Sequence, residues 1–277
     1  LYRVELSNQA GGSVKSWILK DYEKSFSKDE FDLLGNADVR GTKFKPFSTV
    51  IRDSEGTYTQ IPGLPKVTGD FDGKNVFFTN GQATIIFEYF TPELGKIRKE
   101  LTFNEVGYDV KVSFDNELTR KYRDSEVLML MGGGVGDLIN IKDDGNVEVG
   151  RETNGYLVRK AGGGIERIQS FVTELDANKF KERETALKGE YFSETANNAR
   201  DFYTWAGLEN NYFMTLAYGD KGYGFFPVYR LQAVNAIQSG ETTKYFAVPY
   251  IGIKTEKDRA TFKLYCGPKD LQILETV

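Results

Sequence analysis

Short segments in which apolar and polar residues alternate, separated by glycine-containing turns, constrain the fold of this chain most strongly. Residues 108–114 (YDVKVSF) place four apolar side chains on one face and three polar ones on the other, which is the pattern of a half-buried β-strand. Residues 97–103 alternate similarly, but Lys99 falls in the inner row, which predicts a sheet edge or a strand end there. Residues 84–90 and 246–253 are more continuously apolar and predict strands that are covered on both faces.

Proline and glycine residues indicate where these strands are interrupted or end. Pro249 has no backbone donor, so the second apolar segment is expected to meet an edge or a bulge there. Residues 219–222 (GDKG) separate two aromatic-rich segments and predict a hairpin. Further dipeptides typical of tight hairpins are Asp72-Gly73, Asn80-Gly81, Asp144-Gly145 and Asn154-Gly155.

The pattern predicts an all-β fold, a large antiparallel β-sandwich formed by a single domain over residues 1–277. Apolar residues make up 40% of the chain and aromatic residues 14%, and no stretch rich in proline or serine divides it. Helical pattern is confined to residues 177–188 and to a short C-terminal helix over residues 268–277. Pro268 suits the first position of that C-terminal helix.

The composition excludes several classes of functional site. The chain contains no histidine and one cysteine, so histidine-dependent nucleophile systems, histidine-ligated zinc and thiolate metal sites cannot form. Cys266 alternates with Phe262 and Leu264, and we expect its thiol to be buried on the inner face of a strand. The net charge is −4 without a dense run of Lys or Arg, which argues against nucleic-acid binding. No apolar stretch reaches the ~20 residues that span a bilayer.

Three local patterns suggest ligand chemistry, each with a simpler alternative. The glycine-rich residues 131–136 lack the helical pattern that follows a phosphate-binding loop, so a strand connection is favoured. Residues 143–146 (DDGN) carry calcium-type ligands without the EF-hand spacing and predict a hairpin turn. Carboxylates are numerous, and two of them converging across a groove, as in a glycosidase, remain an alternative. We expect no bound cofactor and no metal ion.

Aromatic residues cluster between residues 202 and 213. Such a cluster can stack on sugar rings or anchor a partner. Alternation at Tyr212, Met214 and Leu216 also fits an ordinary core, which is the favoured interpretation. The candidate groove aromatics are Tyr203, Trp205, Tyr212 and Phe213.

Three motifs, in order along nearly the whole chain, resemble the large periplasmic domain of YidC-type membrane protein insertases. Residues 11–22 (GGSVKSWILKDY) resemble its first hairpin, where a double glycine turn precedes a strand. Residues 205–213 (WAGLENNYF) resemble its Trp-x-Gly turn leading into a Tyr-Phe strand. Residues 265–269 (YCGPK) resemble its final strand, which continues into Gly-Pro-Lys and a short helix. Many relatives carry Gly-Pro-Gly near residues 131–136, so Gly133 is a departure.

This resemblance implies a large twisted β-sandwich, a supersandwich similar to galactose mutarotases and sugar-binding domains, that catalyses nothing. The domain would stand at the periplasmic face of the bacterial inner membrane, between the first transmembrane helix and the insertase core. Its partners, reached through the full-length protein, would be components of the Sec translocon and membrane-protein substrates. Flanking segments outside the present sequence would attach it to the membrane.

The resemblance also implies a role for the C-terminal segment. Gly267, Pro268 and Lys269 would connect the sandwich to a helix that faces the membrane part, with Leu271 and Leu274 packing that helix onto the sheet. A capping helix without a partner is the alternative.

A carbohydrate-binding, mutarotase-like envelope protein without catalysis is the second functional hypothesis. Stacking on sugars needs only aromatic side chains and a few amide donors. The enzymatic version is disfavoured because mutarotases use histidine beside a catalytic glutamate, and this chain contains no histidine.

Overall fold

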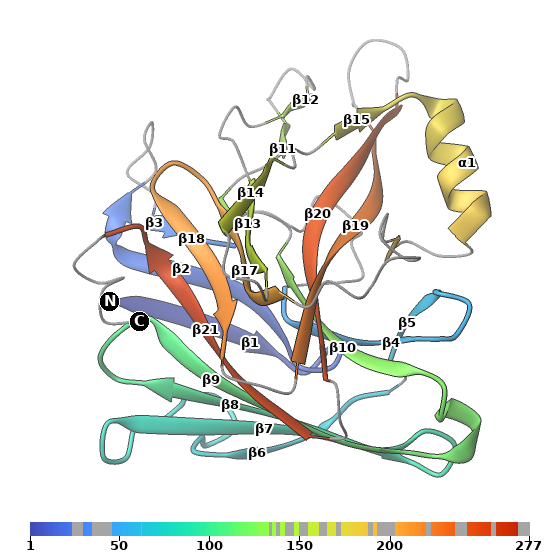
Figure 1. The fold of residues 1–277 in the computed structure, drawn as a ribbon. Helices are drawn as coiled ribbons and strands as arrows, with labels where there is room; N and C mark the ends of the chain where they lie inside the picture. The colour runs from blue at the N-terminus through green and yellow to red at the C-terminus, as the bar shows by residue number, and fades with distance from the viewer. Residues whose placement is uncertain are drawn as a thin grey trace.

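The structure is a computed structural model. It describes residues 1–23, 30–34, 46–61, 63–132, 135–136, 139–141, 147–149, 155–160, 165–169, 173–187, 191–192, 203–219, 223–235, 243–255 and 259–270. Within these residues β-strands dominate, and every strand pair is antiparallel (Figure 1).

Two large sheets form the body of the protein. In spatial order, the nine-stranded sheet contains β14 (Ile165–Gln169), β13 (Gly155–Lys160), β17 (Tyr203–Glu209), β18 (Phe213–Tyr218), β21 (Arg259–Pro268), β9 (Asp109–Leu118), β8 (Gly95–Asn104), β7 (Gln82–Thr91) and β6 (Lys66–Gly69). The seven-stranded sheet contains β16 (Tyr191–Phe192), β19 (Tyr223–Asn235), β20 (Thr243–Thr255), β10 (Glu126–Gly132), β4 (Ser48–Arg52) and β5 (Tyr58–Gln60), while β15 (Thr173–Leu175) also pairs with β20.

Smaller elements surround these sheets. A three-stranded sheet contains β1 (Tyr2–Ser7), β2 (Ser13–Glu23) and β3 (Glu30–Asp32), and a two-stranded sheet contains β11 (Ile139–Ile141) and β12 (Val147–Val149). The described helices are the 3-10 helix η1 (Arg120–Tyr122) and α1 (Ala177–Leu187). None of the described helices is long and apolar enough to cross a membrane.

One hydrophobic core lies between the two large sheets, which confirms the predicted all-β sandwich. The nine-stranded sheet contributes side chains such as Leu101, Val112 and Phe262, and the seven-stranded sheet contributes Met129 and Ile251. Each of these five side chains is at most 2% exposed. Burial of apolar area on this scale supplies the main driving force for folding.

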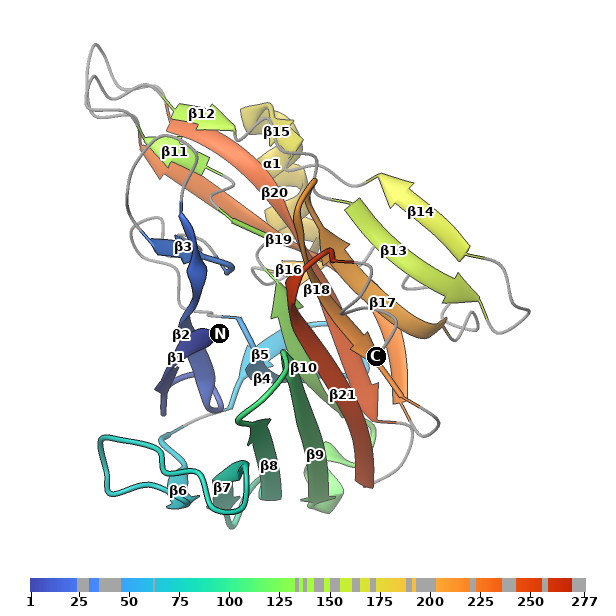
Figure 2. The same cartoon turned by 90° about the vertical axis from the view of Figure 1, so that its left-hand side faces the viewer.

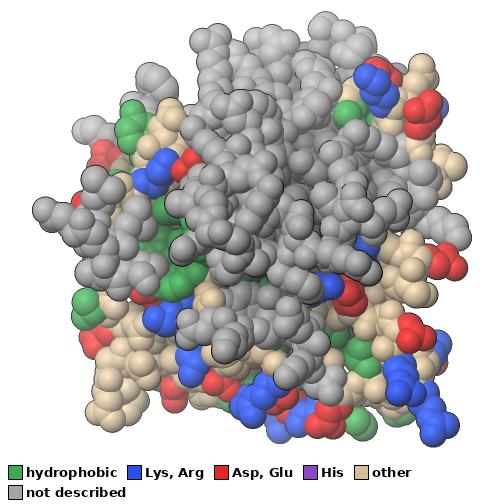
Figure 3. Space-filling model, viewed as in Figure 1, with side chains coloured by type: hydrophobic (Ala, Val, Ile, Leu, Met, Phe, Trp, Pro, Cys, Tyr) green, Lys and Arg blue, Asp and Glu red, His purple; other side chains and the backbone are tan. Residues whose placement is uncertain are grey.

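The outer face of the nine-stranded sheet is polar in β8 and β9, as alternation predicts. In β8 and β9 the inner residues are buried and the outer residues are half-buried or exposed. The same alternation holds for β7, so the prediction that residues 84–90 are covered on both faces is wrong. Charges of both signs are interspersed over the lower part of the view in Figure 3, where β6 to β9 lie.

Lys99 does not mark a strand edge, contrary to the prediction. It lies in the middle of β8, between β7 and β9, and only 1% of the residue is exposed. Its Nζ donates hydrogen bonds to the carbonyl oxygens of Gly12 and Phe47, the latter at 2.8 Å. Burial lowers the pKa of Lys99 well below its usual value. The lysine therefore joins the β1–β2 turn and the segment before β4 to the sheet.

Pro249 lies on β20, which pairs with β19 along its whole length and with β15 and β10 over different parts of its other side. The β10 pairing ends at Tyr250, and the β15 pairing begins at Ala247. Among the described residues, Val248 and Pro249 are therefore paired only with β19. A missing backbone donor is tolerated at this change of neighbour.

Two predicted glycine turns are confirmed. Ala10, Gly11 and Gly12 all have positive φ angles, and they turn β1 into its antiparallel partner β2. A Cβ at Gly12 would lie 2.4 Å from Cγ of Phe87, so only glycine fits there. Asn80 and Gly81, with φ angles of 52° and 77°, form the tight turn before β7, as expected for a turn of type I′.

Other predictions are corrected or lie outside the described residues. The predicted hairpin at 219–222 is wrong, because β18 and β19 belong to different sheets. The helix predicted at 177–188 is confirmed as α1. Pro268 is the last residue of β21 and does not begin a helix. The remainder of the predicted C-terminal helix, with Leu271 and Leu274, lies outside the described residues, as do residues 143–146 and Asn154.

Candidate functional site

Five of the predicted site residues meet at one end of the nine-stranded sheet. Strand β18 pairs with β21, so that Phe213 lies opposite Pro268 and Met214 lies opposite Gly267. The turn between β17 and β18 therefore lies beside the last residues of β21. We call this site the strand-end junction, and it consists of Glu209, Asn210, Tyr212, Phe213, Gly267, Pro268 and Lys269.

Asn210 shapes the turn of the junction. Its Oδ1 accepts hydrogen bonds from the backbone N–H groups of Tyr212 (2.9 Å) and Phe213 (2.8 Å). Asparagine favours such turns because its side chain can replace a backbone acceptor. Trp205 and Gly207 lie inside β17, so the Trp-x-Gly turn suggested by the resemblance is wrong, and the chain turns at Asn210 instead.

Lys269 fixes the end of β21 to this turn. Its backbone N–H donates to the carbonyl oxygen of Tyr212 at 2.7 Å. Its Nζ lies 2.6 Å from Oε2 of Glu209 and donates to the carbonyl oxygen of Asn210 at 3.2 Å. The Glu209 side chain is only 4% exposed. A buried carboxylate needs such a partner, because an unpaired buried charge is strongly destabilising.

Gly267 has a steric reason to be glycine. A Cβ at this position would lie 2.7 Å from Cγ of Tyr108 and 3.0 Å from the hydroxyl oxygen of Tyr265. The Tyr265 hydroxyl donates to the carbonyl oxygen of Pro268 at 2.5 Å. The aromatic rings thus pack directly on the backbone of the Gly-Pro-Lys segment and hold its path.

The candidate groove aromatics do not line one groove. Phe213 is 7% exposed and belongs to the core, where its ring stacks on Phe31 with centroids 4.2 Å apart. Tyr212 is 66% exposed in the turn. Trp205 lies near the other end of β17, opposite Tyr218, and the backbone of Tyr203 lies beyond it.

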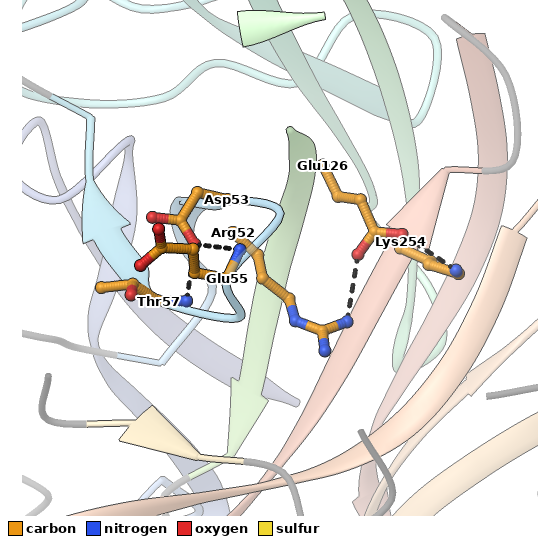
Figure 4. Close-up of polar contacts among 6 residues, drawn as sticks. All are labelled: Arg52, Asp53, Glu55, Thr57, Glu126 and Lys254. Carbon is orange, nitrogen blue, oxygen red and sulfur yellow. Dashed lines mark hydrogen bonds and ion pairs between the residues drawn. The ribbon is translucent and has the colours of Figure 1, made fainter. Parts of the chain in front are cut away.

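A second polar cluster crosses the seven-stranded sheet (Figure 4). Glu126 at the start of β10 accepts from Nη1 of Arg52 on β4 at 3.2 Å and from Nζ of Lys254 on β20 at 3.0 Å. All three side chains are at most 35% exposed. To the left of them in Figure 4, Asp53 Oδ1 accepts from the backbone N–H of Thr57 at 2.8 Å and shapes the β4–β5 turn.

This charge cluster fits a cross-strand structural role. It joins three neighbouring strands through one carboxylate and two cations, whereas glycoside hydrolysis uses two carboxylates. The Arg52 guanidinium carbon lies 5.8 Å from the Tyr58 ring centroid. Burial raises the pKa of Tyr58 to about 12, although nearby Arg52 lowers it in part.

Burial also raises the pKa values of other ionisable side chains and thereby favours their neutral forms. The pKa of the Cys266 thiol is raised because the side chain is fully buried, which confirms the expected position of this residue. The pKa of Tyr218 is raised by burial and by the hydrogen bond that its hydroxyl donates to Asp109 at 2.8 Å. Among the described residues, no group of three or more acidic or cysteine side chains is arranged to hold a metal ion.

Sequence reasoning missed Glu209 and Asn210. The pair Asn210-Asn211 before Tyr212 is a turn signal that predicts this bend. Glu209 gave no local signal, because its partner Lys269 is distant in the chain and the two approach only through the pairing of β18 with β21.

No protein-family model and no curated protein sequence matches this chain. Among solved structures, the chain is similar to a GH36 alpha-galactosidase, a variant of AgaA from Geobacillus stearothermophilus, in complex with 1-deoxygalactonojirimycin. The sequence identity is 11%, the TM-score is 0.30, and the match covers 98% of this chain and 40% of that chain. The chain thus spans well under half the length of that enzyme, and a similarity at this level carries no inference about activity.

Proposed function

We propose that this chain is the non-catalytic periplasmic domain of a YidC-type insertase of the bacterial inner membrane. The full-length protein inserts and folds membrane proteins, alone or with components of the Sec translocon. The observation that carries the proposal is the strand-end junction. It unites two of the three motifs of the resemblance, because Lys269 binds both Glu209 and the turn at Tyr212.

The junction suits a domain that must be held in a fixed orientation relative to the segment that follows β21. Beyond Lys269 the chain leaves a strand whose last residues are fixed by the ion pair to buried Glu209, by Tyr265 and by the steric fit of Gly267. A rigid exit of this kind holds a β-sandwich in a defined orientation relative to whatever follows it.

The proposal is tested first by the coding sequence on both sides of residues 1–277. We expect an apolar segment of ~20 residues shortly before Leu1 and several more after Val277. A reading frame that lacks these segments would refute the proposal.

A depletion experiment then tests the activity. Depletion of the full-length protein from its host should leave a multi-spanning membrane protein uninserted, as measured by its accessibility to protease. Re-expression of the full-length protein should restore insertion, and unchanged insertion after depletion contradicts the proposal.

Carbohydrate binding is the second candidate, and exposed Tyr212 is the observation in its favour. The separation of Tyr212 from Trp205 along β17 and β18 weakens it, because the two aromatic side chains form no common platform. Calorimetric titration with galactose, glucose and their oligosaccharides decides between the two proposals. Binding tighter than millimolar that Tyr212→Ala abolishes and Phe90→Ser preserves would favour the sugar-binding protein.

A further inference from the structure

Exposed large hydrophobic side chains are concentrated at one end of the sandwich. Eight such side chains are found among the described residues. Six of them lie at the end that contains the strand-end junction, with exposed fractions between 38% and 82%. These six residues, which we call the apolar end, are Leu1, Val76, Phe77, Phe78, Val106 and Tyr212.

The register of the nine-stranded sheet places these residues together, although they are far apart in the sequence. The β17–β18 turn with Tyr212 lies beside the end of β21, and Tyr265 of β21 pairs with Asp109 at the start of β9. The β8–β9 turn with Val106 therefore lies at the same end.

The remaining residues of the apolar end follow from the next strands. Asn104, the last residue of β8, pairs with Gln82, the first residue of β7. The arm between β6 and β7, which carries Val76 to Phe78, thus extends from the same end. Leu1 joins them, because the hydroxyl of the neighbouring Tyr2 donates to the carbonyl oxygen of Asn104 at 3.1 Å. This end is turned toward the viewer in Figure 2.

The arm over residues 70–81 is ordered by its own hydrogen bonds. Asp70 Oδ2 accepts from the backbone N–H of Thr84 at 2.7 Å, and the carbonyl oxygen of Asp70 accepts from the N–H of Phe77 at 2.8 Å. Asp72 Oδ1 accepts from Asn75 N–H at 2.7 Å, and the pKa of Asp72 is lowered by the backbone hydrogen bonds it accepts from Asn75 and Lys74. The backbone is therefore organised in advance, while the side chains of Phe77 and Phe78 stay 52% and 43% exposed.

The arrangement of the apolar end favours a bilayer over a protein partner. A protein interface concentrates its binding energy in a buried cluster that fills a pocket. Here one to three apolar side chains protrude from each of several separate turns, which suits independent insertion between lipid headgroups. Tyrosine is enriched at the membrane interface, and phenylalanine is among the apolar residues that interfacial segments bury at the boundary between headgroups and acyl chains.

The charges beside the apolar end indicate the kind of lipid. Among the described residues, the exposed charged side chains next to these turns and to Leu1 are Lys20, Asp21, Asp70, Asp72, Lys74, Glu105 and Asp270, so five acidic side chains stand against two basic ones. Anionic lipids would be repelled by this excess, because surface attraction to them relies on Lys and Arg. A zwitterionic lipid surface is compatible with it.

We propose that the apolar end docks the domain on the interfacial region of a zwitterionic lipid bilayer, with Phe77 and Phe78 as its main anchors. This inference rests on the proposed function, because it assumes that a membrane is close to the domain. Beyond that function, it specifies which surface of the domain faces the lipid. Docking would occur at the same end as the exit of β21, so the exit and the anchors together would fix the orientation of the sandwich.

Flotation of the 277-residue chain with phosphatidylcholine vesicles tests the docking. The wild-type chain should float with the vesicles, and the double variant Phe77→Ser, Phe78→Ser should bind about tenfold more weakly, because two partly exposed aromatic rings lose their insertion. The matched control is Leu64→Ser with Phe90→Ser. These residues are 67% and 72% exposed and follow the register of β6 and β7 toward the opposite end, so this variant should bind like the wild type.

A fluorescence measurement checks that the arm itself enters the lipid. The variant Phe78→Trp should show a blue-shifted emission when phosphatidylcholine vesicles are added, and Phe90→Trp should show no shift. Replacement of part of the lipid by phosphatidylglycerol should not strengthen binding. Loss of binding in the Leu64→Ser, Phe90→Ser control, or binding that requires phosphatidylglycerol, would overturn the proposal.

The failure of this inference can be separated from the failure of the proposed function. If the wild-type chain does not float, the docking proposal is overturned and the apolar end is left to a protein partner, whatever the flanking coding sequence contains. If the chain floats and the flanking apolar segments are missing, the docking stands for a peripheral membrane protein while the insertase proposal fails.

Discussion

Replacement of Lys99 by methionine tests the role of a charged side chain inside the core. Methionine retains the length of the lysine side chain but not its amine. The carbonyl oxygens of Gly12 and Phe47 would lose the hydrogen bonds they accept from Lys99. A buried acceptor left without its donor costs about 1–3 kcal/mol. The variant leaves two such acceptors, and the loss is offset in part because the polar amine no longer has to be buried. We therefore expect Lys99→Met to lower the free energy of unfolding by about 2–4 kcal/mol.

Urea unfolding followed by tryptophan fluorescence measures this change. Trp17 is a suitable reporter, because it is 1% exposed and its ring centroid lies 6.2 Å from that of Phe47. Lys111→Met is the matched control, since Lys111 is exposed on the outer face of neighbouring β9, and it should change stability by less than about 0.5 kcal/mol. A Lys99→Met protein as stable as the wild type would show that the two carbonyl oxygens do not depend on the amine.

The pH dependence provides an independent check on Lys99. Burial depresses its pKa below the usual value of 10.5, so the unfolded chain binds a proton more readily than the folded protein between the depressed pKa and 10.5. Stability contributed through this group must therefore rise with pH across that window. The difference in unfolding free energy between wild type and Lys99→Met should grow as the pH rises toward 10. A difference that is constant from neutral pH to pH 10 would contradict the depressed pKa.

Three further perturbations have defined outcomes. Lys269→Met should lower the free energy of unfolding by about 3 kcal/mol, because it removes the ammonium group that pairs with the buried Glu209 carboxylate. Lys263→Met on the exposed face of β21 should have little effect, and equal urea midpoints for the two variants would contradict the role of the ion pair. Gly267→Ala should cost about 1–3 kcal/mol, since the added Cβ meets a tyrosine ring, and an unchanged midpoint would mean that the ring moves freely. Between about pH 10 and pH 12 the protein should lose stability. Burial raises the pKa of Tyr58 and Tyr89 to about 12 in the folded protein, so the unfolded chain loses these protons at lower pH. Circular dichroism that stays constant through pH 12 would refute this.

Local patterns in the sequence were sufficient where neighbouring residues decide the structure. Alternation predicted β8 and β9, because one face of each strand meets the core and the other meets water. The turns at Gly11-Gly12 and at Asn80-Gly81 were predicted because they need positive φ angles that few other residues adopt. In these places the physical cause lies within a few residues of the effect.

Local patterns failed where the cause is a distant segment. Lys99 looked like an edge residue because its acceptors, the carbonyl oxygens of Gly12 and Phe47, come from other parts of the chain. The glycine-containing segment at 219–222 predicted a hairpin, but its sequence does not specify whether the next strand joins the same sheet, and β18 and β19 belong to different sheets. Position in the sheet had to be known before either residue pattern could be interpreted.

The candidate sites show the same division between local and long-range causes. Tyr212 and the Gly-Pro-Lys segment were each singled out, but only the pairing of β18 with β21 brings them into one junction with Glu209. The apolar end depends still more on topology. In an antiparallel sheet, successive turns alternate between the two ends when consecutive strands are neighbours. That rule places the β6–β7 arm and the β8–β9 turn together, but the β17–β18 turn joins them only because β21 enters between β18 and β9. A surface formed by such turns is therefore a property of strand order, and an exposed phenylalanine becomes informative only when that order shows which other side chains share its end.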